Sequence, residues 1–181
     1  MKKSDDLNAL FHDAPVAMFE FSNEGRIVDI NYALVDMLGY DSKNEIFELV
    51  KDVAQDIYVN ETDRKEILQE LWQSDSLSVH EAKFKKKYGE LIYVKISAWN
   101  RKVDGNRNAG KLGIVEDITK TKNNQTHQKE QEHRYKTLFE NSNDAIIILE
   151  KMNLIEWNNK ACEMFFGNTE CKVLPAFESL H

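Results

Sequence analysis

Residues 14–40 decide the fold, and they read APVAMFEFSNEGRIVDINYALVDMLGY. Within this stretch, residues 16–21 and 26–30 are mostly apolar and contain the β-branched and aromatic side chains that favour strands. Between them stands SNEG, residues 22–25, a turn cluster that ends in glycine. The pattern predicts a β-hairpin.

A short capped helix is predicted directly after the hairpin. Asn31 is of a type that caps helix N-termini, and Gly39 is of the type that most often follows the last helical residue. Between these two residues, Leu34 and Leu38 are four apart and so share one helical face. We therefore expect a two-turn helix over residues 32–38.

The rest of the first unit passes from helical to strand patterns. Residues 42–58 carry apolar side chains without Gly or Pro, which predicts short helices over a core. Residues 60–73 open with a capping-box-like sequence and place apolar residues at helical spacing, which predicts a longer amphipathic helix. Period-two patterns over 77–87, 90–103 and 111–118 predict three antiparallel strands. This order fits an α+β fold whose antiparallel sheet is covered on one face by helices.

The opening of this unit recurs later in the chain. Residues 10–39 align without a gap on residues 138–167. The identical pairs are Leu10/Leu138, Phe11/Phe139, Ala17/Ala145, Ile27/Ile155, Asn31/Asn159, Ala33/Ala161 and Gly39/Gly167. The second copy then departs into NTECKVLPAFESLH, without the later helices and strands. We expect a complete unit over 10–119 after a flank at 1–9, and an incomplete second unit over 138–181.

A polar segment, residues 120–137, links the two copies. Its sequence up to Lys136 is KTKNNQTHQKEQEHRYK, without Gly or Pro and with almost no apolar residue. Gln, Lys, Glu and Arg favour helix, so we interpret it as a solvated helical linker, with a disordered polar spacer as the alternative. Any heptad frame between Lys122 and Arg134 has polar a and d positions, which argues against a strong coiled-coil seam.

Four motifs of the first unit, in this order along the chain, resemble those of PAS domains, the sensory modules of bacterial and archaeal signalling proteins. They are the stretch 14–40 quoted above, YVNETDR at 58–64, KKKYGELIYVKIS at 85–97 and GIVEDIT at 113–119. Residues 134–167 look like the opening of a second PAS repeat. The resemblance implies a five-stranded antiparallel sheet covered on one face by short helices, and a role in sensing rather than catalysis.

The composition of the chain disfavours some classes of binding partner and suggests a cellular compartment. The 24 basic and 31 acidic residues give a net charge of −7, which disfavours nucleic acid and anionic membranes as direct partners. The N-terminus leads into no apolar signal segment, and no stretch is apolar enough to span a membrane. Only Cys162 and Cys171 are cysteines, so no disulfide framework is expected and a reducing cytoplasm fits.

Catalytic motifs are absent from the sequence. There is no Gly-rich phosphate loop and no G-x-S-x-G nucleophile motif. His127 and His133 lack the acidic residue and downstream Pro of a phospho-accepting histidine, so we expect both to be solvent-facing linker residues. We therefore expect no enzyme in this chain, while a longer parent protein could be a histidine kinase or a diguanylate cyclase.

Two cofactors of PAS relatives are disfavoured. Haem-binding relatives place a histidine on or beside the long helix, and residues 61–74 contain none; His80 follows on a strand with polar neighbours. Light-sensing relatives carry a reactive cysteine in the unit, and the first copy has no cysteine, which disfavours a covalent flavin photocycle. Cys162, in the second copy, is interpreted as a small packing residue. We therefore expect no cofactor, and the alternative is that the unit binds a small ligand that the sequence does not identify.

The resemblance implies a small-ligand pocket between helices and sheet. Our candidates for its lining are Met18, Ile30, Leu34, Leu38, Leu68, Trp72, Phe84, Val94 and Ile96. The plainer interpretation is that these side chains only fill a core. Trp72 is the side chain that would distinguish a ligand pocket from a filled core, because a buried indole needs an acceptor for its N–H and often stacks on planar ligands.

The exit from the last strand suggests how a signal leaves the unit. We expect Thr119 to cap the linker helix through its hydroxyl and Asp117 to hold a donor on the sheet. The leading hypothesis is a sensory module that perceives a ligand or partner and relays a conformational change through the linker, within a homodimer and toward a downstream domain. The alternatives are a structural dimerisation module without ligand, or a fragment of a sensor kinase or diguanylate cyclase that lacks its catalytic domain.

Overall fold

The computed structural model describes residues 8–22, 26–73, 77–101, 110–151 and 153–167. It divides into two compact units, Met1–Lys122 and Asn123–His181.

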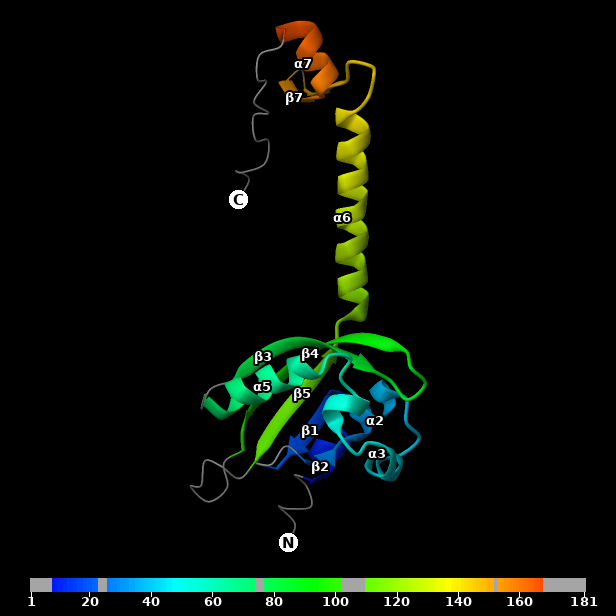
Figure 1. The fold of residues 1–181 in the computed structure, drawn as a ribbon, viewed down its shortest axis with the longest axis vertical. Coiled ribbons are helices and arrows are strands. Elements are labelled where there is room, and N and C mark those ends of the chain that lie inside the picture. Colours follow the sequence, from blue (N-terminus) through cyan, green and yellow to red (C-terminus); the bar gives the residue numbers. More distant parts are fainter. Residues whose placement is uncertain (1–7, 23–25, 74–76, 102–109, 152, 168–181) are drawn as a thin grey trace. The chain divides into compact units, whose positions relative to one another are not determined.

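The first unit is built on a five-stranded antiparallel sheet with the strand order β2-β1-β5-β4-β3 (Figure 1). The strands are β1 Ala17–Phe21, β2 Ile27–Ile30, β3 Ser78–Lys85, β4 Leu91–Asn100 and β5 Lys111–Asp117. The first and last strands of the unit meet at the centre of the sheet, because β5 pairs with both β1 and β4. The predicted α+β fold with five antiparallel strands is confirmed.

Helices cover one face of this sheet (Figure 1). They are α2 Tyr32–Leu38, α3 Lys43–Leu49, α4 Val53–Asp56 and α5 Glu61–Gln73. The first three are capped at their N-termini, since the side chains of Asn31, Ser42 and Asp52 each accept a backbone N–H of the following turn; the cap at Asn31 was predicted. Gly39 ends α2 with a φ of 76°, the left-handed conformation that favours glycine.

The core lies between the sheet and these helices. Along β4, Ile92, Val94, Ile96 and Ala98 are buried, and the residues between them are more exposed. The same alternation continues across the ladder, where Ala17 pairs with Val115 and Val115 with Ile96. One face of the sheet is therefore apolar and covered by helices, as the period-two pattern predicts.

A fully buried asparagine joins the hairpin to α2. The Oδ1 atom of Asn31 accepts the backbone N–H of Met18 at 2.8 Å and that of Leu34 at 3.1 Å. Its Nδ2 donates to the carbonyl of Val16 at 2.7 Å and to that of Ala14 at 3.3 Å. One side chain thus caps the helix and fixes the chain that enters β1, and the asparagine itself is withdrawn from water.

The second unit repeats this hairpin and helix. It contains β6 Ile147–Glu150, β7 Asn153–Trp157 and α7 Asn159–Phe166, together with the end of α6. Asn158 is fully buried, and its Oδ1 accepts the N–H groups of Ile146 and Ala161, both at 2.9 Å. Its Nδ2 donates to the carbonyls of Asp144 and Phe139. Asn158 therefore does in the second unit what Asn31 does in the first.

This equivalence corrects the gapless alignment of the two copies. Met18 and Ile146 occupy the same place in the two networks, as the alignment has it, but Asn31 corresponds to Asn158 rather than to Asn159. The bonded residues are 13 apart in the first hairpin and 12 apart in the second, so the second hairpin is one residue shorter. The neighbouring Asn158 and Asn159 conceal this shift in the sequence, and the extra residue of α7 restores the register at Gly167.

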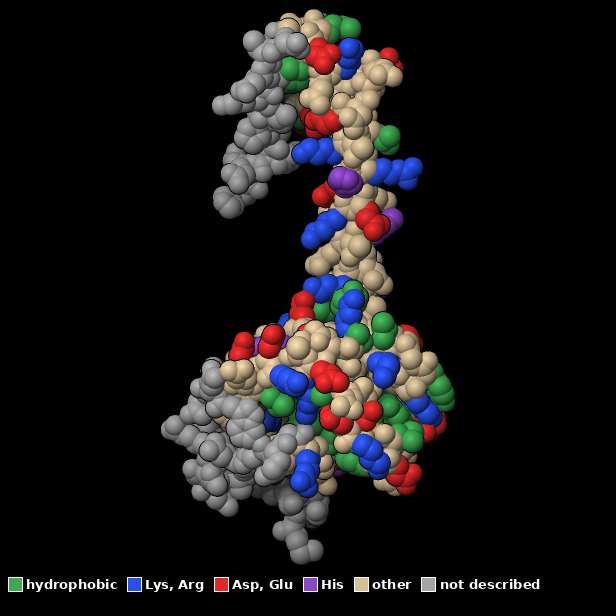
Figure 2. All heavy atoms as spheres, viewed as in Figure 1, with side chains coloured by type: hydrophobic (Ala, Val, Ile, Leu, Met, Phe, Trp, Pro, Cys, Tyr) green, Lys and Arg blue, Asp and Glu red, His purple; other side chains and the backbone are tan. Residues whose placement is uncertain are grey.

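The polar linker is helical, as predicted. Helix α6 spans Thr119–Glu140, and Phe139 is its buried residue. On the faces that Figure 2 shows, basic and acidic side chains are interspersed along this helix and over the first unit. Among the described residues, no helix has the length and apolar character needed to cross a membrane.

Cys162 is buried on α7, as expected of a packing residue. It also takes part in a disulfide bond, which the sequence analysis did not predict. The other cysteine of the chain, Cys171, lies outside the described residues.

Candidate functional site

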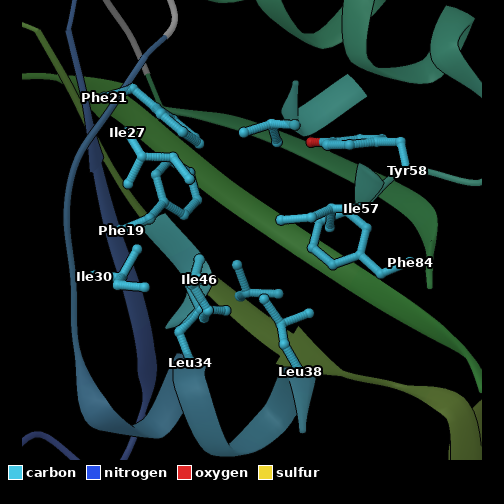
Figure 3. A pocket seen from close by; sticks show the side chains of 12 residues that line it. Phe19, Phe21, Ile27, Ile30, Leu34, Leu38, Ile46, Ile57, Tyr58 and Phe84 are labelled. Carbon is cyan, nitrogen blue, oxygen red and sulfur yellow. The ribbon is translucent and has the colours of Figure 1, made fainter. Parts of the chain in front are cut away.

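A small apolar cavity lies in the first unit between the sheet and α2–α4 (Figure 3). Its volume is about 40 Å³. The side chains that line it are Phe19, Phe21, Ile27, Ile30, Leu34, Leu38, Ile46, Val53, Ile57, Tyr58, Phe84 and Val115. Among these, the Tyr58 hydroxyl is the only polar side-chain group, so the site suits a small molecule that is mainly hydrocarbon.

Four of the nine residues predicted to line a pocket do so: Ile30, Leu34, Leu38 and Phe84. Val94 and Ile96 are buried on the same face of the sheet, but they belong to the surrounding core and not to the cavity wall. Leu68 is half-buried and outside the lining, while Ile67 before it is buried. The side chain of Trp72 lies outside the described part of the chain.

Met18 was assigned to the wrong face of its strand. Alternate strand residues point to opposite faces, and Phe19 is the residue that points to the helices and lines the cavity. Met18 is half-buried on the other face. The wall residues that sequence reasoning missed include Phe19 and Phe21, which the same alternation could have found, and Tyr58, for which the sequence offers no comparable signal.

The position of Phe19 depends on a glycine in the neighbouring strand. Phe19 pairs with Gly113 across β1 and β5, and a Cβ atom built on Gly113 would lie 2.3 Å from the tip of the Phe19 ring. The ring therefore occupies the space above the glycine. Because Phe19 also lines the cavity, Gly113 helps to set the shape of that wall.

A buried cation lies beside two aromatic rings of the wall. Arg64, on α5, is 7% exposed, and its guanidinium carbon is 4.9 Å from the centre of the Phe21 ring and 5.7 Å from that of the Tyr58 ring. Burial raises the pKa of Tyr58 to about 12, although the charge of Arg64 and a hydrogen bond from it act in the opposite direction. Tyr58 is thus a neutral phenol at physiological pH, in contact with a positive charge.

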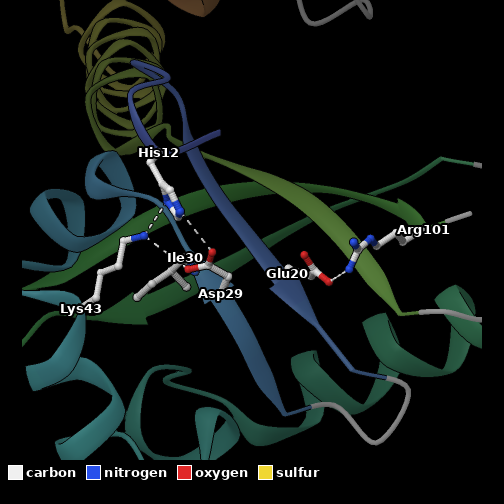
Figure 4. A network of polar contacts seen from close by, with 6 residues as sticks. All are labelled: His12, Glu20, Asp29, Ile30, Lys43 and Arg101. Atoms are coloured by element: carbon white, nitrogen blue, oxygen red, sulfur yellow. Dashed lines mark hydrogen bonds and ion pairs between the residues drawn. The ribbon is translucent and has the colours of Figure 1, made fainter. Parts of the chain in front are cut away.

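A second polar cluster ties together the elements at the edge of the sheet (Figure 4). Lys43 Nζ lies 2.5 Å from His12 Nδ1 and 3.3 Å from Asp29 Oδ1, and His12 Nε2 lies 3.4 Å from Asp29 Oδ2. These residues come from the helical turn at 8–12, from β2 and from α3. None of the three lines the cavity, and we interpret the cluster as structural.

The last strand leads directly from the cavity to the linker helix. Val115 on β5 lines the cavity, and two residues later the Asp117 carboxylate accepts the backbone N–H of Thr119 at 2.8 Å. The predicted cap of Thr119 is wrong: its hydroxyl accepts the backbone N–H of Tyr93 on β4 at 2.9 Å. The helix starts one residue earlier than the capping prediction requires, so Asp117 satisfies a first-turn donor and Thr119 joins the helix to the sheet.

Metal and haem ligation find no support in the wall of the cavity. Its side chains include neither histidine nor cysteine. His80, the candidate nearest the long helix, contacts Ser78 Oγ at 2.5 Å and Glu70 Oε2 at 3.2 Å instead. Within the described residues, no cluster of three or more His, Cys, Asp or Glu side chains could hold a metal ion.

Comparison with a curated protein gives one relative of the whole chain. Sporulation kinase A of Bacillus subtilis (strain 168) is 26% identical over 171 residues, which amount to 92% of this chain and 27% of that protein. The chain thus spans about a quarter of the length of that relative.

Solved structures resemble the first unit. A PAS domain of an HTR-like protein from Haloarcula marismortui has a TM-score of 0.52 and 22% identity, covering 65% of this chain and 93% of its own. A PAS domain from Colwellia psychrerythraea has a TM-score of 0.55 and 21% identity, covering 65% of this chain and 98% of its own. At these identities the likeness establishes the fold.

Family models agree with both units. A model described as PAS domain matches residues 15–120, and a second one, also a PAS domain, matches residues 133–180. The first match alone covers more than half of the 181 residues. The chain therefore belongs to the PAS domain family.

Proposed function

We propose that the first PAS domain binds a small ligand in the apolar cavity and relays its binding through β5 into α6. The observation that carries this proposal is the continuity of one strand: Val115 forms part of the cavity wall, and Asp117 holds the first turn of the helix. A ligand that displaces Val115 would move Asp117 as well, because a strand paired on both sides shifts as a unit. The start of α6 would then change its hydrogen bonding.

The family and the similarity to a kinase support a place for this module in a longer signalling protein. The relative named sporulation kinase A contains the matched region within about a quarter of its length. We infer that this chain, too, acts on a catalytic domain, of the histidine kinase or diguanylate cyclase class. The longer reading frame, if it encodes such a domain, would establish the output.

The chemistry of the wall favours a small ligand over a bulky cofactor. A cavity of about 40 Å³ has no room for a haem or a flavin, and its described wall includes no cysteine to which a flavin could be attached. We therefore propose an unconjugated small molecule, held by burial of its apolar surface.

The test uses the isotope-labelled 181-residue chain and two variants. Native mass spectrometry first shows whether the purified protein carries a ligand, and NMR titration with small apolar fragments then follows the amides of Val115, Asp117 and Lys120. Val115→Phe fills the cavity, and we expect it to abolish both binding and the response at Lys120. Ile114→Phe places the same ring on the other face of β5 and serves as the matched control. Binding without any response beyond Val115 would contradict the relay.

A structural dimerisation module is the second candidate, because within the described residues one face of the sheet has no cover of helices. Met18 pairs with Ile114, and Leu112 pairs with Trp99, so four half-buried apolar side chains share that face. We propose that a second copy of the chain covers it. Sedimentation equilibrium should then show a dimer that Ile114→Lys dissociates, and a wild-type monomer at all concentrations would refute this interface.

A further inference from the structure

The proposed sensing function leaves the chemical class of the ligand open, and the wall of the cavity constrains it. Among the twelve described side chains of the wall, eleven are purely hydrocarbon, and the twelfth is Tyr58. Figure 3 shows the Tyr58 hydroxyl directed inward, toward the side of the cavity that carries Phe21. A ligand with one polar end and an apolar body would match this distribution.

The hydrogen bonding of Tyr58 determines which polar end fits. The guanidinium of Arg64 lies 5.7 Å from the centre of the Tyr58 ring, and a guanidinium can only donate hydrogen bonds. Arg64 therefore does not compete for the phenol proton, which Tyr58 keeps because burial raises its pKa to about 12. A donor polarised by a neighbouring cation is stronger than a free phenol, and its best partner is an oxygen acceptor.

The buried charge of Arg64 adds a preference for an anion. The guanidinium is 7% exposed and lies over the rings of Phe21 and Tyr58, both of which belong to the wall. Attraction between opposite charges is much stronger at such a site than in water, because the surroundings are of low polarity. An anionic oxygen near the Tyr58 hydroxyl would thus gain from the hydrogen bond and from the cation behind it.

We propose that the ligand of the first PAS domain is a short-chain monocarboxylate, whose tail fills the apolar cavity and whose carboxylate meets Tyr58 and Arg64. This inference rests on the proposed sensing function. The cavity of about 40 Å³ limits the tail to a few carbon atoms. Arg64 and Tyr58 then define one end of the site. The other end is defined by Ile30 of β2 and by Leu34 and Leu38 of α2.

The test compares an acid with its neutral counterpart of the same shape. Butyrate and butyramide are titrated into the labelled 181-residue chain, and dissociation constants are taken from the amide shifts of wall residues. Butyrate should bind at least about tenfold more tightly than butyramide, as expected for a charge-assisted contact. Within the series from acetate to butyrate, each methylene should strengthen binding about fourfold, because it buries one more CH₂.

Three variants locate the source of the preference. Arg64→Gln should reduce the preference for the acid to less than about threefold, and Tyr58→Phe should weaken it while leaving the ring in place. Lys65→Gln removes the same charge from the adjacent, exposed position of α5 and should change nothing. A cooperative thermal transition checks that each variant is folded. If Arg64→Gln does not fold, the comparison of butyrate with butyramide in the wild-type protein still tests the carboxylate assignment.

The outcomes separate this inference from the sensing function. Equal binding of butyrate and butyramide, or an acid preference that survives in folded Arg64→Gln, would overturn the carboxylate assignment. Binding of butanol but of neither butyrate nor butyramide would also overturn it and would leave the sensing cavity intact. If no probe of any kind perturbs the wall residues, both the assignment and the proposed function fail.

Discussion

The hydroxyl oxygen of Thr119, the first residue of α6, accepts the backbone N–H of Tyr93 on β4 at 2.9 Å. The carbonyl of the same Tyr93 accepts the N–H of Ile118 at 2.9 Å. Both backbone groups of one strand residue are therefore committed to the chain that enters the helix. The linker helix is fastened to two strands, to β4 through Tyr93 and to β5 through Asp117.

Thr119→Val should loosen this attachment. Valine has nearly the shape of threonine but no acceptor, so the Tyr93 N–H loses its partner at a cost of about 1 kcal/mol. Amide exchange at Tyr93 should accelerate about fivefold, with smaller changes elsewhere in β4. Thr121→Val, on an exposed residue two positions along the same helix, is the control. Unchanged exchange at Tyr93 would show that the contact does not hold the strand.

The two neighbouring asparagines of the second unit should differ sharply in importance. Asn158→Ala leaves two backbone donors and two carbonyls without their partner, and we expect a local loss of about 2 to 4 kcal/mol. Asn159→Ala removes an exposed side chain and should stay within about 0.5 kcal/mol. Amide exchange at Ile146 and Ala161 in the full chain measures both. A larger loss in Asn159→Ala than in Asn158→Ala would instead support the gapless alignment, in which Asn159 corresponds to Asn31.

Gly113→Ala should destabilise the first unit by about 1 to 3 kcal/mol through overpacking. The added methyl group meets the Phe19 ring, and Gly113 is not among the glycines with positive φ, so steric contact is the cause and not backbone strain. Urea unfolding measures the loss. The double variant Phe19→Leu/Gly113→Ala should lose less than the sum of the single variants, because the smaller side chain frees the space. Strict additivity would mean that the ring and the glycine are independent.

Tyr58 should make the first unit sensitive to alkaline pH. Its pKa is about 12 in the folded protein, against 10.0 for the ordinary phenol, because burial disfavours the phenolate. The folded state therefore keeps a proton that the unfolded state releases. This contribution to the free energy of unfolding is complete below pH 10 and is lost as the pH rises toward 12, by about 3 kcal/mol in total. Tyr58→Phe should show a correspondingly weaker loss of stability between pH 10 and 11.5, measured by urea unfolding, and equal slopes in both proteins would contradict the assignment.

Local patterns in the sequence were sufficient for the fold. The alternation along 91–100 placed the buried face of β4, and Asn31 with Gly39 marked the ends of α2, because caps and period-two patterns act between residues close in the chain. The repeat and the helical linker were readable for the same reason. The resemblance to PAS domains was carried by the four motifs at 14–40, 58–64, 85–97 and 113–119.

Only the tertiary structure determined which residues line the cavity and which contacts attach the start of α6 to the sheet. Alternation along β1 puts Phe19 and Met18 on opposite faces, but only the packing of the helices fixes that the face with Phe19, beside Gly113 of β5, is the covered one. Tyr58 and Arg64 belong to one stretch, residues 58–64, but Phe21 comes from the distant strand β1, and no spacing in the sequence brings the guanidinium onto both rings. Thr119 was expected to cap its own helix, but the N–H of Tyr93 takes the hydroxyl instead. In each case the local sequence is compatible with more than one partner for a side chain. The packing of segments that are distant in the sequence determines which contact forms.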